Sequence, residues 1–200
     1  TALILFGWPL IANQFFPTAA PPTVAEQKAD TPVAGSVTPD APAAAVTAAD
    51  KAVPLGQALA GNRLLIETPK LKGSVNLEGA RIDDLLLLTH RTELAKTSPA
   101  VRLFAPSGTA NSYFARFGWV GTGIAAPDDK TLWAASAPKL TPETPVTLSW
   151  SNAQNQKFEI LLSIDKDYML SAEQRFTNGS TAAVQVANFG LISRRGEPKD

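Results

Sequence analysis

KFEILLSIDKDYMLSAEQRFTNGSTAAVQVANFGLISR, residues 157–194, consists of three runs of alternating apolar and polar side chains separated by short polar turns. In the middle run Leu170, Ala172 and Phe176 lie on one face, whereas Glu173 and Arg175 lie on the other. A period of two residues is typical of a strand with one buried face. Asn178-Gly179 predicts a type I′ hairpin turn, because both residues tolerate positive φ. We therefore predict a meander of these strands, with turns at 152–156, 165–167 and 178–179.

Short apolar runs broken by turn residues continue upstream of this stretch. They lie at 64–68, 71–77, 80–88, around Phe104, and at 112–120, 131–135 and 145–151, with a turn predicted at Glu78-Gly79. Many short strands with turn residues between them are typical of an all-β sandwich or barrel. We predict that residues 61–200 form one β-sandwich domain.

The segment from residue 19 to residue 60 has a different composition. It contains 14 alanines and 6 prolines, no aromatic residue and six charged residues. Such a segment cannot bury enough apolar surface to offset the entropy of ordering its backbone. We predict an extended linker, with a short helix around residues 41–52 as the alternative.

Residues 1–18 carry no charge, and 11 of them are apolar. As a helix they would be about 27 Å long, slightly short of a bilayer core. We predict an uncleaved membrane anchor, truncated at its N-terminus, because no basic residue follows the apolar run until Lys28. The alternative is a cleaved signal peptide. The predicted anchor residues are Leu3, Ile4, Leu5, Phe6, Trp8, Leu10, Ile11, Phe15 and Phe16.

The overall composition excludes several classes of function. Eighteen basic and eighteen acidic residues give a net charge of zero, which argues against nucleic-acid binding. The chain contains no cysteine and a single histidine, His90, so disulfides, thiolate nucleophiles and Cys/His zinc sites are excluded. We predict no cofactor and no catalytic metal.

None of the polar motifs predicts catalysis. His90 is typical of a solvated residue at a strand end. Asp83 and Asp84 should point to opposite faces of a strand, so they should not form a paired-carboxylate site. Asp128-Asp129 is typical of a turn. Residues 118–123 (GWVGTG) lack the lysine of a phosphate loop and read as a loop beside a strand end.

Three further features have simple structural explanations. The sequon Asn178-Gly179-Ser180 coincides with the predicted hairpin turn. Arg194-Arg195 is typical of a solvated strand end. Trp119, Trp133 and Trp150 could stack on a sugar, but tryptophans on strands are more often part of a core.

Taken together, three blocks of this sequence resemble the start of the YidC membrane protein insertases of Gram-negative bacteria. They are ALILFGWPLIANQFF, RLLIETPKLKGSVNLEGARIDDLLLLTHR, and the block from Leu148 to Gly196. The second block matches the family motif at Asn76, Gly79, Ile82 and residues 85–88, and the third block matches at Phe158, Tyr168, Phe176 and Asn178. These blocks cover about two thirds of the chain.

The resemblance implies a protein of the bacterial inner membrane whose periplasmic domain has a twisted β-supersandwich fold, similar to galactose mutarotases. It also implies that this sandwich is cut short here, after Ile192. It also implies that insertion is carried out by later membrane helices, and that the partners are the lipid bilayer, nascent membrane proteins and the Sec translocon components SecDF and SecYEG. On this basis we expect an accessory, non-enzymatic domain. The alternative is a carbohydrate-binding or mutarotase-like sandwich, although one histidine cannot supply the acid and base of a mutarotase.

Overall fold

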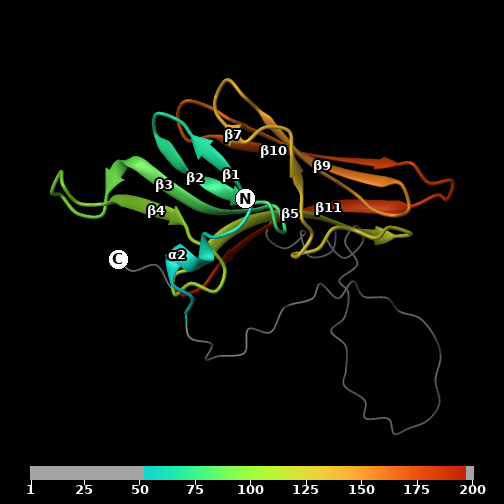
Figure 1. Cartoon of the computed structure of the whole chain (residues 1–200), viewed down its shortest axis with the longest axis horizontal. Helices are drawn as coiled ribbons and strands as arrows, with labels where there is room; N and C mark the ends of the chain where they lie inside the picture. The colour runs from blue at the N-terminus through green and yellow to red at the C-terminus, as the bar shows by residue number, and fades with distance from the viewer. Residues whose placement is uncertain (1–51, 197–200) are drawn as a thin grey trace, which may run out of the picture. The chain divides into compact units, whose positions relative to one another are not determined.

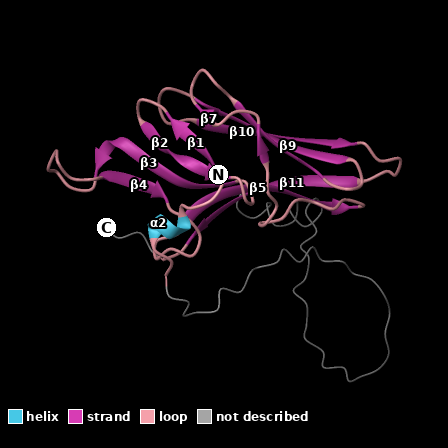
Figure 2. Cartoon of the chain, in the orientation of Figure 1, coloured by secondary structure: helices cyan, strands magenta, loops and turns pink. Residues whose placement is uncertain are grey.

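The computed structural model describes residues 52–196, whose regular secondary structure is almost entirely strand (Figures 1 and 2). The predicted membrane anchor, residues 1–18, and most of the predicted linker lie outside this range. No helix within the described range is both long enough and apolar enough to span a bilayer. The last part of the predicted linker forms one turn of helix, α2 (Leu55–Ala58), and the N–H of Val53 donates to the carbonyl of Gly108 at 2.9 Å.

The strands form two sheets, and all neighbouring strands pair antiparallel except β1 and β7. The larger sheet has the order β11-β5-β3-β2-β1-β7, and β4 pairs with the distal part of β3. Its strands are β1 (Arg63–Glu67), β2 (Leu71–Asn76), β3 (Arg81–Arg91), β4 (Ala100–Phe104), β5 (Tyr113–Thr122), β7 (Lys139–Leu140) and β11 (Gln185–Arg194). The smaller sheet has the order β10-β9-β8-β6 and comprises β6 (Ala134–Ala135), β8 (Val146–Ser151), β9 (Gln156–Ile164) and β10 (Leu170–Asn178).

The core lies between the two sheets and follows the alternation predicted from the sequence. In β9 the buried residues Phe158, Ile160, Leu162 and Ile164 alternate with more exposed neighbours. Leu64 and Ile66 of β1 occupy the corresponding positions in the larger sheet. The all-β class predicted from the sequence is confirmed, and so is the core position of the tryptophans. Trp119 and Trp133 are 4% and 3% exposed, and Trp150 packs at the margin of the core.

The aromatic residues form a continuous cluster within this core. The ring of Phe158 lies 5.3 Å from Trp119, 5.8 Å from Trp150 and 5.0 Å from Phe176. Trp119 and Trp133 stack at a centroid distance of 6.0 Å. Because these tryptophans fill the interior, the two that are most buried offer no flat surface on which a sugar could stack.

The predicted meander is correct for β8, β9 and β10 and wrong for β11. β10 pairs with β9, whereas β11 leaves this sheet and pairs with β5 across ten residues. Asn178-Gly179 is therefore the start of a crossover between the sheets, and neither residue has positive φ. Gly179 is required for a different reason: a Cβ at this position would lie 2.4 Å from the carbonyl oxygen of Asn155.

The prediction of a loop at the glycine-rich segment 118–123 is also wrong. Residues 118–122 belong to β5, and only Gly123, with a φ of +77°, follows the strand. A Cβ on Gly121 would lie 1.9 Å from the carbonyl oxygen of Gln185. Only glycine fits at position 121, because the backbone of β11 passes so close to it. A single sequence does not show which strand will lie beside β5 at this position.

The predicted turn at Glu78-Gly79 is present, one position further along. Gly79 and Ala80 both have positive φ, at 75° and 48°, and they connect β2 to β3. The N–H of Gly79 donates to the carbonyl of Thr131 at 2.8 Å, and a Cβ on Gly79 would lie 2.6 Å from the backbone oxygen of Asp129. Backbone contacts with the segment before β6 therefore fix this turn.

Candidate functional site

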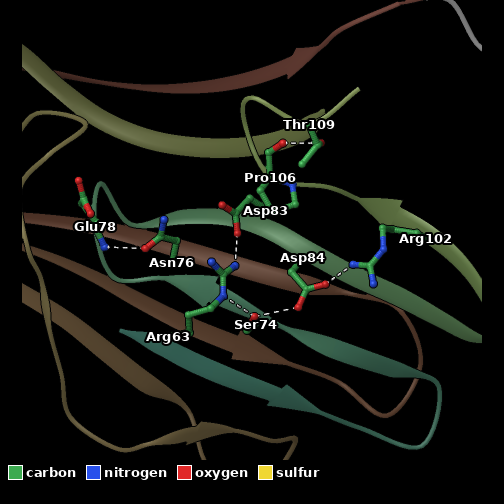
Figure 3. A network of polar contacts seen from close by, with 9 residues as sticks. All are labelled: Arg63, Ser74, Asn76, Glu78, Asp83, Asp84, Arg102, Pro106 and Thr109. Atoms are coloured by element: carbon green, nitrogen blue, oxygen red, sulfur yellow. Dashed lines mark hydrogen bonds and ion pairs between the residues drawn. The ribbon is translucent and has the colours of Figure 1, made fainter. Parts of the chain in front are cut away.

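A network of ionic and polar side chains crosses β1, β2, β3 and β4 (Figure 3). The Arg63 guanidinium pairs with the Asp83 carboxylate, and its Nε donates to the Ser74 hydroxyl at 2.7 Å. The Ser74 hydroxyl donates to Asp84 at 2.8 Å, and Asp84 also pairs with Arg102. The network thus links four strands through side chains alone.

A β-bulge brings the two neighbouring carboxylates into this one network. Ser74 pairs with Asp84 and Val75 pairs with Ile82, so Asp83 is an extra residue with no partner in β2. In a bulge the strict alternation of side chains between the two faces is broken. The sequence did not predict that Asp83 and Asp84 share one network: Arg63 contacts Asp83 directly and reaches Asp84 through Ser74.

The pair formed by Arg63 and Asp83 is almost fully buried, with side chains 7% and 2% exposed. Burial raises the pKa of the Asp83 carboxyl above its ordinary value, and the nearby Arg63 guanidinium opposes this effect. Two nitrogens in this region, Arg63 Nη1 and Arg81 Nε, are buried without a hydrogen-bond partner among the described residues. The pair formed by Arg102 and Asp84 is more accessible, at 28% and 13%.

The chemistry of this network indicates a structural role. Each carboxylate is held by an arginine, and an arginine stays protonated at all relevant pH values. No group of three or more His, Cys, Asp or Glu side chains within residues 52–196 is arranged to hold a metal ion. The arrangement neutralises charge inside the larger sheet and ties its strands together.

A shallow groove of about 610 Å³ lies beside Arg63. Its apolar lining comes from Leu64, Leu77, Trp133 and the segment 134–138. The segment before β7 is joined to the larger sheet at two points: Trp133 N–H donates to the Leu77 carbonyl at 2.9 Å, and Leu65 N–H donates to the Pro138 carbonyl at 3.2 Å. These two hydrogen bonds attach the segment from Trp133 to Pro138, which lines the groove, to the larger sheet.

His90 lies far along β3, on the exposed part of the strand, as predicted. Its ring packs edge-on against Tyr168 at 5.8 Å, and the Tyr168 hydroxyl bonds to Thr89. Lys70 lies 5.3 Å from the centre of the Tyr168 ring and pairs with Asp167. These contacts attach the β9–β10 turn to the end of β3.

The other polar motifs have structural roles. Asp128 accepts hydrogen bonds from Thr131 Oγ1 at 2.7 Å and from Lys130 N–H at 3.0 Å, and the Thr131 hydroxyl lowers the pKa of the Asp128 carboxyl. The prediction of a turn there is confirmed. Arg194 lies in β11 with its guanidinium 5.4 Å from the Tyr113 ring, at the strand end where it was expected.

Sequence reasoning did not identify Arg63, Ser74 and Arg102 as members of a network. One signal was available: Ile82-Asp83-Asp84-Leu85 places two acids inside an otherwise apolar strand, and buried charges require partners. The identity of these partners could not be predicted from the sequence, because Arg63 and Arg102 lie 20 and 18 residues away from the aspartates they pair with.

The fold and this network define a two-sheet β domain stabilised by an aromatic core and a buried ionic cluster. A family model described as "YidC periplasmic domain" matches residues 63–200. The chain is 42% identical to a membrane protein insertase YidC of Zymomonas mobilis over 98% of this chain and 33% of that protein. Insertases of the same name from Acidiphilium cryptum and Bradyrhizobium diazoefficiens are 43% and 35% identical, over 70% and 99% of this chain and 24% and 36% of theirs.

The chain therefore belongs to the YidC membrane protein insertase family. Family membership assigns the β domain to the periplasm and the protein to the inner membrane. The chain spans about a third or less of the length of these three relatives. The resemblance described from sequence motifs is confirmed, and the carbohydrate-binding alternative is not favoured.

Proposed function

We propose that this chain is the periplasmic part of an insertase that places and folds proteins in the inner membrane, with or without the Sec translocon. One observation supports this proposal above all: the family match covers the β domain from residue 63 to residue 200. The identity of 42% with the Zymomonas mobilis insertase extends over nearly the whole chain, including the part before the domain.

In this proposal the domain has an accessory role and catalyses no reaction. The carboxylates of the buried network are paired with arginines, and His90 contacts Thr89 and Tyr168 rather than a carboxylate that could orient it as a base. General acid–base catalysis requires a group that can accept and release a proton near the substrate. The domain would instead contact SecDF, SecYEG or nascent membrane proteins.

The proposal also includes the finer features predicted from the sequence. Residues 1–18 would anchor the chain, residues 19–60 would separate the anchor from the domain, and the fold would be of the galactose-mutarotase-like supersandwich type. Two stacked sheets of mainly antiparallel strands are compatible with such a fold.

Deletion of residues 63–196 from a complete insertase that contains this chain tests the accessory role. Insertion of a reporter membrane protein should be largely retained in cells depleted of their own insertase, whereas co-purification with SecDF should fall. Loss of insertion at normal protein levels would contradict an accessory role. Mutarotation by the purified chain at an enzyme-like rate, abolished by His90→Ala, would contradict a non-catalytic domain.

A further inference from the structure

The hairpin formed by β3 and β4 projects from the domain, at the left of Figure 1. Its tip loop, residues 92–99, carries Leu94, whose relative exposure of 106% is the highest of any large apolar side chain in the described range. Exposed leucines are common on protein surfaces, but a leucine at the apex of a projecting hairpin makes no contact that stabilises the fold.

The tip loop is held in one conformation by its own hydrogen bonds. The Ser98 hydroxyl bonds to the carbonyls of Glu93 and Ala95 at 3.0 and 2.8 Å, and Thr92 N–H donates to the Pro99 carbonyl at 3.0 Å. Arg91 Nη1 donates to the Ser98 carbonyl at 3.3 Å. Leu94 is therefore presented by an ordered loop, so a contact at this position would cost little additional entropy.

The charge around Leu94 is weakly positive. Arg91 and Lys96 flank it, Glu93 is the one acid of the tip loop, and neither Lys96 nor Glu93 forms an ion pair within residues 52–196. An apolar side chain between basic residues complements a lipid surface, where the chain meets hydrocarbon and the cations meet phosphate groups.

We propose that the tip loop contacts the periplasmic surface of the inner membrane, with Leu94 inserted among the lipids and Arg91 and Lys96 at anionic headgroups. The inference rests on the proposed function, which keeps the domain tethered beside the bilayer. A tether raises the local concentration of the tip, so a weak contact is sufficient. A protein partner fits less well, because a stable protein interface uses roughly 20–30 residues a side, far more than this loop offers.

The absence of cysteine from the chain permits a clean test. The full chain carrying Ala95→Cys is labelled with an environment-sensitive NBD fluorophore and reconstituted in vesicles of phosphatidylethanolamine and phosphatidylglycerol. We expect a blue-shifted emission that is quenched by spin-labelled lipids. Adding Leu94→Ser should restore the emission seen in water, whereas the control Leu132→Ser, at a residue 56% exposed elsewhere on the domain, should change nothing.

Each other outcome contradicts the inference in a distinct way. A chain that floats with the vesicles but carries an unquenched, water-exposed probe contradicts the tip contact alone. A blue shift without quenching by lipid spin labels shows a protein contact and also overturns the inference. A chain that does not float with the vesicles contradicts the anchor at residues 1–18 and the tip contact together.

Discussion

Asp83→Asn removes the negative charge that faces Arg63 and leaves the shape of the side chain unchanged. The two side chains are 2% and 7% exposed, so water cannot replace the lost partner. Removing one member of a buried ion pair destabilises a protein by about 3–5 kcal/mol, because the remaining charge stays buried without compensation. The amide oxygen of the substituted side chain can still accept one hydrogen bond from Arg63, so we expect the lower end, about 3 kcal/mol.

Urea unfolding followed by tryptophan fluorescence measures this loss, because Trp119 and Trp133 change from a buried to a wet environment. With a urea dependence of about 2 kcal/mol per molar, the midpoint should fall by about 1.5 M. Asp84→Asn is the matched control. Its partner Arg102 is 28% exposed, and the Ser74 hydroxyl can still donate to the new amide, so we expect a loss of about 1 kcal/mol.

A double substitution separates the ion pair from simple loss of packing. Arg63→Met combined with Asp83→Leu removes both charges, so it should be less destabilising than the sum of the two single changes. Additive effects, or an Asp83→Asn variant as stable as Asp84→Asn, would refute the view that Asp83 is the compensating charge of a buried arginine.

Three other predictions concern the core, the glycines and the turn before β6. Phe158→Ala, at a residue with no exposed surface, should destabilise the domain by about 3–5 kcal/mol in the same urea assay. Gly121→Ala should disturb the pairing of β5 with β11 and speed amide hydrogen exchange in β11, whereas Gly56→Ala, which meets open space in α2, should leave exchange there unchanged. The Thr131 hydroxyl lowers the folded-state pKa of Asp128, so the stability that Asp128 contributes is present above its unfolded value of about 4 and is lost as the pH falls through the folded pKa. Carboxyl NMR titration should show Asp128 titrating below an ordinary aspartate, and Thr131→Val should remove the difference.

The positions of most strands follow from the sequence alone, because the signal is local. A residue pattern with period two places alternate side chains on one face whatever the rest of the chain does. The burial of β9 and the alternation along β10 match this pattern residue by residue. Family membership could also be predicted from the sequence, since it depends on the order of residues along the chain.

The pairing of the strands and the composition of the network were decided by the tertiary structure. Asn178-Gly179 has the local properties of a hairpin turn, yet β11 joins β5 in the other sheet, and Gly179 serves to let the Asn155 carbonyl approach. Strand alternation predicts that Asp83 and Asp84 point to opposite faces. The bulge opposite Ser74 and Val75 shifts the pairing of β2 with β3 by one residue, and both carboxylates join one network. Which strands pair, and in what register, depends on burying both sheets against one core at once, and that condition involves residues far apart in the chain.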